Sequence, residues 1–181
     1  IIELAGIVAS HLRSKKIEVV LVGGLAVEIY SDNIYLTRDI DMVNTNYQSP
    51  KIMHQAMAEL GFFKNGKFYV NESTDITIEF PSAPLGVGDD IIKETTTIRI
   101  GENELPILYA IDVVKDRLAA YFNWQDRPAL AQALTVMLSH EINPEDIKDF
   151  CEREQTLVEY SFIEKLYKLS EIQESRLMGD I

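Results

Sequence analysis

The sequence predicts an α/β (α+β) protein in which an α/β part, residues 1–106, is followed by a helical region, residues 107–181. Up to residue 106, short β-branched runs alternate with helical patterns and with Gly and Pro turns, which is typical of mixed α/β architectures. From residue 109 onward, the apolar residues recur only at helical spacing. A chain of 181 residues that is 46% hydrophobic can bury one core and carry a smaller appendage.

The chain begins with a predicted helix over residues 1–14, whose apolar residues follow the helical period. Residues 17–22 are β-branched and almost wholly apolar, which predicts a central strand covered on both faces. Gly23-Gly24 ends this strand, and residues 25–30 are expected to form a short helix. Residues 37–43 alternate between polar and apolar types, which predicts a second strand.

A second long helix is predicted to begin at Ser49 and Pro50, because Ser caps helix N-termini and Pro suits the first helical position. It ends at Gly61. The remaining segments of the α/β part are a hairpin over residues 62–70, an alternating strand over 75–80, a loop over 81–88 and a hairpin over 95–108.

Four helices are predicted after the α/β part, at residues 109–122, 126–139, 144–153 and 156–176. Asn143, Pro144 and Glu145 form an N-terminal signal for the third of them. The last helix carries an apolar stripe that could pack on the α/β part or on another subunit of a homo-oligomer.

The amino-acid composition argues against nucleic-acid partners, disulfides and membrane spans. Asp and Glu number 29 and Lys and Arg number 17, for a formal net charge of −12, so stable nucleic-acid binding is not expected. The single cysteine, Cys151, allows no intrachain disulfide and favours a reducing compartment, which we take to be the cytoplasm. No apolar stretch approaches the roughly 18 residues that a membrane span needs.

The candidate chemistry lies on the predicted strands. Asp39 and Asp41 are two residues apart on one strand, so their carboxylates face the same way about 7 Å apart. Such oxygen ligands suit divalent cations, and a third carboxylate would complete a site for two metal ions. Glu79 is the candidate third acid, and Asp75 is the alternative because it shares the same face of its strand.

Gly23 and Gly24 suggest a phosphate site beside these acids. Without β-carbons the backbone can approach a phosphate closely, and the N–H groups at the start of the next helix can bind it. A phosphate cradle with a carboxylate cluster indicates phosphoryl or nucleotidyl transfer from a nucleoside triphosphate.

The run Val22-Gly23-Gly24-Leu25-Ala26, followed by Thr37-Arg38-Asp39-Ile40-Asp41, resembles the DNA polymerase β-like nucleotidyltransferase superfamily. Within it, the chain is similar to small uncharacterised bacterial nucleotidyltransferase-like proteins that include the abortive-infection toxin type. The segment from Ile111 to Tyr121, and on through Trp124-Gln125-Asp126-Arg127, resembles the stretch that follows the core in those proteins. The resemblance covers roughly residues 15–155 and implies a mixed sheet flanked by helices.

By this resemblance, Asp39, Asp41 and Glu79 are the metal-binding and catalytic residues, and the metal is Mg²⁺ or Mn²⁺. Gly23 and Gly24 would hold the triphosphate. Glu79 departs from the family, in which Asp is common at this position.

Three basic residues are further candidates for binding the nucleotide. Arg38 could reach a substrate phosphate or form an ion pair with the neighbouring carboxylate. Lys115 and Arg117 could contact the triphosphate or the base, or could be surface charges beside a core helix.

Two classes of function follow from the resemblance. The first is an enzyme that transfers a nucleoside monophosphate from an NTP to a hydroxyl of a protein, a small molecule or an RNA end. The second is a non-catalytic or regulatory protein of the same fold, such as a toxin–antitoxin component that acts by protein binding.

Overall fold

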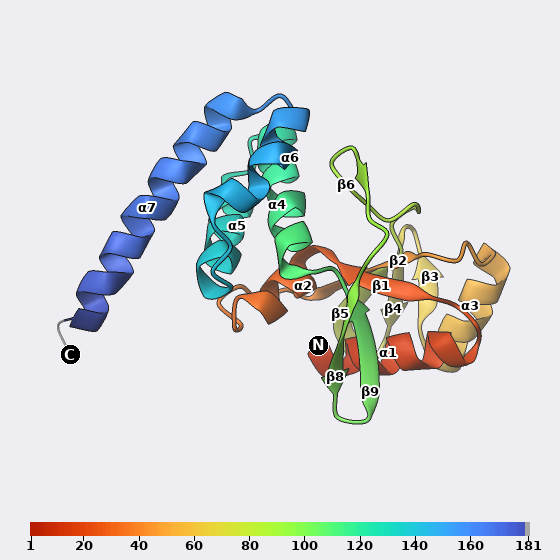
Figure 1. The fold of residues 1–181 in the computed structure, drawn as a ribbon. Helices are drawn as coiled ribbons and strands as arrows, with labels where there is room; N and C mark the ends of the chain where they lie inside the picture. The colour runs from red at the N-terminus through yellow and green to blue at the C-terminus, as the bar shows by residue number, and fades with distance from the viewer. Residues whose placement is uncertain (180–181) are drawn as a thin grey trace. The chain divides into compact units, whose positions relative to one another are not determined.

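The computed structural model describes the backbone of residues 1–179 and the side chains of residues 1–173 (Figure 1). The chain forms two compact units, Ile1–Tyr109 and Ala110–Ile181. The first unit contains the strands and the first three α-helices, and the secondary structure of the second, as far as residue 179, is helical. The observed boundary therefore lies three residues beyond the predicted one at residue 106.

Within the described residues, the first unit is built on a seven-stranded mixed sheet, with the strand order β3-β4-β5-β2-β1-β9-β8. Its strands are β1 (Val19–Val22), β2 (Asp39–Asn44), β3 (Phe63–Asn65), β4 (Phe68–Asn71), β5 (Thr74–Glu79), β8 (Thr96–Ile100) and β9 (Asn103–Ile107). The pairs β2–β5 and β1–β9 are parallel, and the other neighbouring pairs are antiparallel. The predicted α/β class with a mixed sheet is confirmed.

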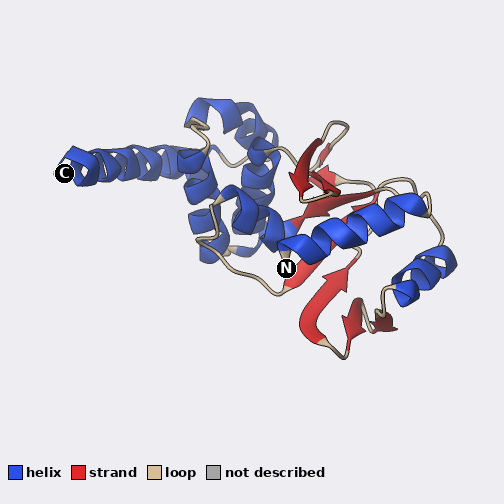
Figure 2. Ribbon diagram, turned by 90° about the horizontal axis from the view of Figure 1, so that it is seen from below, coloured by secondary structure: helices blue, strands red, loops and turns tan. Residues whose placement is uncertain are grey.

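Helices α1 (Ile2–Ser14) and α3 (Pro50–Glu59) lie on one face of this sheet (Figure 2). The ring nitrogen Nε2 of His11 lies 3.0 Å from the carbonyl oxygen of Ala56, which links the two helices. The side chain of Ser49 caps α3 by accepting from the backbone N–H of Ile52, as the sequence predicts. The core of the unit is fully apolar at its centre, where Leu12, Leu21, Ile40, Met42 and Ile78 are completely buried.

The structure differs from the sequence prediction at two connections. The predicted loop over residues 81–88 contributes to a two-stranded ribbon, β6 (Gly86–Val87) and β7 (Asp90–Ile91). Strands of two residues are too short to show a period of alternation. The third predicted C-terminal helix is divided into a 3₁₀ turn, η1 (Pro144–Ile147), and α6 (Lys148–Arg153). Asp146 accepts from the backbone N–H of Asn143 at 2.7 Å, which completes a capping box at this turn.

The second unit contains the helical hairpin of α4 (Ala110–Trp124) and α5 (Arg127–Ser139), and the long helix α7 (Leu157–Gly179). Helix α7 buries Tyr160, Ile163 and Tyr167. Val158 and Leu169, two other apolar residues of this helix, are 82% and 63% exposed. Across the described residues, none of the helices combines the length and the apolar character that crossing a membrane requires.

Candidate active site

The candidate acids lie on two neighbouring parallel strands, β2 and β5 of the first unit. In the register of this pair, Asp39 is opposite Thr77 and Asp41 is opposite Glu79. Since alternate residues of a strand point to opposite faces, Asp39, Asp41 and Glu79 share one face of the sheet. The residues between them, Ile40 and Ile78, point to the other face and are fully buried.

A short network of hydrogen bonds fixes the start of β2. The carboxylate of Glu28 on helix α2 (Gly23–Tyr30) is 4% exposed and accepts from the backbone N–H of Thr37 at 2.9 Å. The Thr37 hydroxyl oxygen then accepts from the N–H of Asp39 at 3.2 Å. On the other side, the carbonyl of Arg38 accepts from the N–H of Thr77 at 3.0 Å. These bonds hold the backbone of Asp39 in place beside β5.

Gly23 lies against the carboxylate of Asp41. Its φ is +67°, in the left-handed region, and a β-carbon at this position would lie 2.4 Å from Oδ2 of Asp41. Both facts require glycine. Gly24 has more room, because a β-carbon there would meet the hydroxyl oxygen of Thr37 at 3.4 Å, an ordinary contact. The structure therefore requires glycine at position 23, whereas position 24 has space for a β-carbon.

The acids already have partners on neighbouring strands. The hydroxyl of Thr77 donates to Oδ1 of Asp39, and the ammonium of Lys67, in the turn between β3 and β4, lies 2.8 Å from Oε2 of Glu79. The hydrogen bond with Glu79 raises the pKa of Lys67, and the charges of Glu79, Asp41 and Asp39 add to this increase. A positive charge thus stands next to the group of acids and partly balances their repulsion.

The donor set fits a divalent cation in type. Carboxylate oxygens are the ligands that Mg²⁺ and Mn²⁺ prefer, and three carboxylates share one face of adjacent strands. Among the described side chains, however, no three His, Cys, Asp or Glu residues are already arranged around a common metal position. The ion pair with Lys67 directs the carboxylate of Glu79 toward an ammonium group. An incoming cation would have to take the place of Lys67.

Asp75, the alternative third acid, forms an ion pair with Arg38 at 2.5 Å. Both side chains are more than three-quarters exposed, so this pair adds little stability. Asp75 precedes Thr77 on β5, whereas Glu79 is the direct neighbour of Asp41. Of the two candidates, Glu79 therefore lies next to Asp41, and the role of either as third acid stays a prediction. The predicted contact of Arg38 with a phosphate stays a prediction.

Lys115 and Arg117 belong to α4, in the second unit. The ammonium of Lys115 lies 3.4 Å from the carboxylate of Asp112, and Arg117 binds the carboxylate of Asp116 at 2.5 Å. Each is therefore paired with an acid of its own helix, and a contact with the nucleotide stays a prediction.

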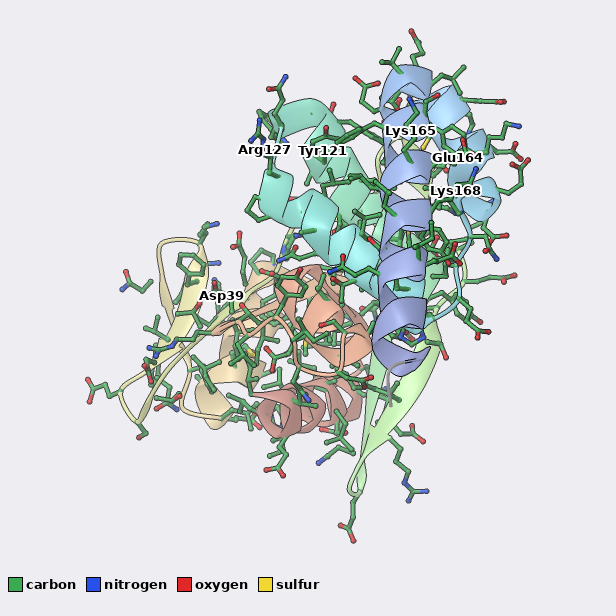
Figure 3. The ribbon with its side chains drawn as sticks, turned by 90° about the vertical axis from the view of Figure 1, so that its left-hand side faces the viewer. Asp39, Tyr121, Arg127, Glu164, Lys165 and Lys168 are labelled. Carbon is green, nitrogen blue, oxygen red and sulfur yellow. The ribbon has the colours of Figure 1, made fainter. Side chains whose placement is uncertain are left out.

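The second unit also has a small cavity of its own. Tyr121 and Arg127 lie together at one end of the hairpin of α4 and α5 (Figure 3), and they line this cavity with Phe122, Gln125 and Glu159. Its volume is about 180 Å³.

Three residues of the site were not singled out by the sequence. Lys67 and Thr77 contact the acids only because β4, β5 and β2 are neighbours in the sheet. The polar position of Thr77 on the acidic face of its strand is a sequence signal that could have identified it. Glu28 is a charged residue in an otherwise apolar helix, which is also a visible signal of a buried partner.

Two solved structures share the fold. A nucleotidyltransferase-like antigenic protein from Paracoccidioides brasiliensis matches with a TM-score of 0.58 and 12% identity, over 87% of this chain and 90% of that one. The antibiotic-resistance factor ANT(2'')-Ia matches with a TM-score of 0.53 and 9% identity, over 99% of this chain and 98% of that one. No protein-family model and no curated protein sequence matches the chain. The chain therefore has the nucleotidyltransferase fold, as its sequence predicts, and the narrower resemblance to abortive-infection toxins stays a prediction.

Proposed function

We propose that this protein is a metal-dependent nucleotidyltransferase that moves a nucleoside monophosphate from an NTP to a hydroxyl acceptor. The observation that carries the proposal is the sharing of one sheet face by Asp39, Asp41 and Glu79, with Asp41 and Glu79 as direct neighbours. The close approach of Gly23 to Asp41 supports it, because it brings the start of α2 to the same acids. The shared fold is consistent with this activity.

The reaction breaks a phosphoanhydride bond of the NTP and forms a phosphoester bond to the acceptor. The acceptor oxygen bonds to the α-phosphorus of the NTP, the bond from this phosphorus to the bridging oxygen breaks, and pyrophosphate leaves with the electron pair. A bound Mg²⁺ or Mn²⁺ would neutralise phosphate charge during this exchange. Asp39 and Asp41 would hold the metal, and backbone N–H groups beside Gly23 and Gly24 would bind the phosphates.

Glu79 has the position for a second task. As the neighbour of Asp41 it would complete the metal site, and it would orient the acceptor hydroxyl and accept its proton. Its ion pair with Lys67 would have to open first. We therefore assign Lys67 to the metal-free state, in which its ammonium offsets the negative charge of the three acids.

A second candidate function is a non-catalytic protein of this fold that acts by binding a protein partner. The Lys67–Glu79 ion pair favours it, because an ammonium group in the acidic cluster could replace a metal permanently. The two functions differ in whether a divalent cation and an NTP bind together at Asp39 and Asp41.

Calorimetric titration of the four NTPs, with Mg²⁺ or Mn²⁺, tests the proposal. The wild type is compared with Asp39→Asn/Asp41→Asn and with Asp75→Asn, a matched control that removes a carboxylate from the same face. We expect metal-dependent binding in the wild type and in Asp75→Asn, and none in the double variant. Label transfer from an α-labelled NTP then identifies the acceptor. Absence of binding in a wild type that circular dichroism shows to be folded would favour the non-catalytic function.

A further inference from the structure

A cavity of about 340 Å³ lies on the other face of the sheet, within the first unit. We call it the aromatic pocket and define it by Asn44, Tyr47, His54, Lys64, Tyr69 and Phe80, which line it together with residues of α3 and of the loop after β5. Asn44 is the last residue of β2, and Phe80 directly follows β5. By strand alternation both point away from the face that carries Asp41 and Glu79. The pocket is therefore separated from the candidate active site by the thickness of the sheet.

Aromatic rings form much of its wall. Tyr69 is 2% exposed and meets the ring of Phe80 edge-on, with 5.4 Å between the ring centroids. Tyr47, by contrast, is 68% exposed and leaves its ring available to a ligand. The wall therefore offers a ligand the exposed ring of Tyr47 and the half-buried ring of Phe80, and such aromatic surfaces suit a planar ring.

An ammonium group and an imidazole stand beside these rings. The ammonium of Lys64 lies 4.8 Å from the centroid of the Tyr69 ring and donates to the carbonyl of Lys67 at 3.2 Å. Within the described part of the chain, Lys64 has no carboxylate partner. Nδ1 of His54 lies 2.5 Å from the hydroxyl of Tyr69, which fixes the imidazole at the pocket wall.

The charge of the pocket is opposite to that of the chain. Acidic residues outnumber Lys and Arg by 29 to 17 over the sequence, yet none of the described residues that line the pocket is Asp or Glu. Glu18 and Glu104 line a second cavity of similar size, about 320 Å³, in the same unit. The absence of acids from the aromatic pocket means that an anion entering it meets Lys64 and His54 without a repelling carboxylate in the wall.

We propose that the aromatic pocket binds a small anion that carries a flat aromatic ring. The ring lies against Tyr47 and Phe80, and the anionic group, a carboxylate or a phosphate, pairs with the ammonium of Lys64. This site is independent of the proposed transferase activity, since it uses none of the residues assigned to metal or NTP.

The first test varies the ligand. Calorimetry without divalent cations compares 2-naphthoate and 2-naphthyl phosphate with 2-naphthamide, which has the ring but no charge, and with inorganic phosphate, which has charge but no ring. We expect both naphthyl anions to bind, the tighter of the two identifying carboxylate or phosphate as the anionic group. Binding of neither anion, or equal binding of 2-naphthamide, would overturn the proposal.

The second test varies the protein. Lys64→Met should weaken binding of the naphthyl anions about tenfold, as expected for the loss of one charged contact. Lys51→Met, which removes an exposed lysine of α3 outside the pocket, should leave it unchanged. Tyr47→Ser should weaken it about fivefold, as expected for the loss of an aromatic contact. Equal affinities of Lys64→Met and Lys51→Met would exclude this pocket.

The location is checked in the Asp39→Asn/Asp41→Asn variant. Binding of the naphthyl anions should persist there, even if the variant has lost NTP binding. Loss of the naphthyl anions in this variant would mean that they occupy the acidic face of the sheet, and it would overturn the assignment to the aromatic pocket. If the wild type does not bind NTP, binding of the naphthyl anions can still be measured. The proposed transferase function and the proposed anion site can therefore be refuted independently.

Discussion

Replacement of Gly23 by alanine should be among the most damaging single-methyl changes in the first unit. Two separate causes act at this position. The φ of +67° places the residue in the left-handed region, and the added β-carbon would lie 2.4 Å from Oδ2 of Asp41. The backbone strain costs about 1–2 kcal/mol, and the displacement of a packed neighbour adds about 1–3 kcal/mol. We expect Gly23→Ala to destabilise the unit by about 2–5 kcal/mol.

Two other glycines separate these causes. Gly101, in the turn between β8 and β9, has φ +59° with nothing within 4 Å of an added β-carbon, so Gly101→Ala adds strain alone and should cost about 1 kcal/mol. Gly24 has neither a positive φ nor a severe contact. Because alanine restricts the unfolded chain and favours helix, Gly24→Ala should change stability by less than about 1 kcal/mol.

Urea denaturation followed by circular dichroism measures these differences. Fluorescence is a poor probe, because the single tryptophan, Trp124, lies in the helical unit and is 82% exposed. Binding of Mn²⁺ provides a second measurement, since Gly23→Ala displaces Asp41 whereas Gly101→Ala does not. Equal destabilisation by Gly23→Ala and Gly101→Ala would refute the role of the Asp41 contact. A loss in Gly24→Ala as large as in Gly23→Ala would refute the whole argument.

Three further results are expected. Lys67→Met should tighten Mn²⁺ binding about two- to fivefold, the range of an exposed ion pair, because it removes the ammonium that competes for Glu79; weaker binding in a paramagnetic-resonance titration would contradict this. Glu79→Gln should weaken Mn²⁺ binding at least about tenfold, whereas Asp75→Asn should not; the reverse order would make Asp75 the third acid. Burial raises the pKa of the Cys151 thiol from 9.0 to about 11. At pH 8, iodoacetamide should therefore react about 100-fold more slowly with the folded protein than with the urea-unfolded chain. Equal rates would place the thiol at the surface.

Local patterns in the sequence were sufficient for much of the fold. The start of α3 was predicted from Ser49 and Pro50, because a cap and a fixed φ act over a few residues only. The side on which Asp39 and Asp41 lie was predicted from alternation, which depends on the strand alone. The placement of Glu79 on the same sheet face as Asp39 and Asp41 required the two strands to be neighbours. The parallel register of β2 and β5 shows that they are.

Features that depend on which strands become neighbours were not predicted. Lys67 meets Glu79 because the β3–β4 hairpin pairs with β5, with Phe68 opposite Glu79. No local pattern gives this pairing, so the sequence offered no reason to place a cation among the acids. The aromatic pocket has the same origin, because Asn44, His54 and Tyr69 come from three separate elements. Binding of a metal ion or a nucleotide is harder still to predict from the sequence, because it depends on molecules that bind after folding.

Strands β2 and β5 carry acidic side chains on one face and buried apolar side chains on the other. The apolar side chains explain how the strands stay paired despite the charge on the acidic face. On one face, repulsion among Asp39, Asp41 and Glu79 needs a cation, which Lys67 supplies in this structure. On the other face, Ile40 and Ile78 are fully buried and anchor the same strands in the core. This anchoring fixes the backbone on which the acids are mounted, so charge repulsion can be relieved by movement of side chains and not by separation of the strands. We therefore expect that the proposed exchange of Lys67 for a metal ion would need only a change of side-chain partners.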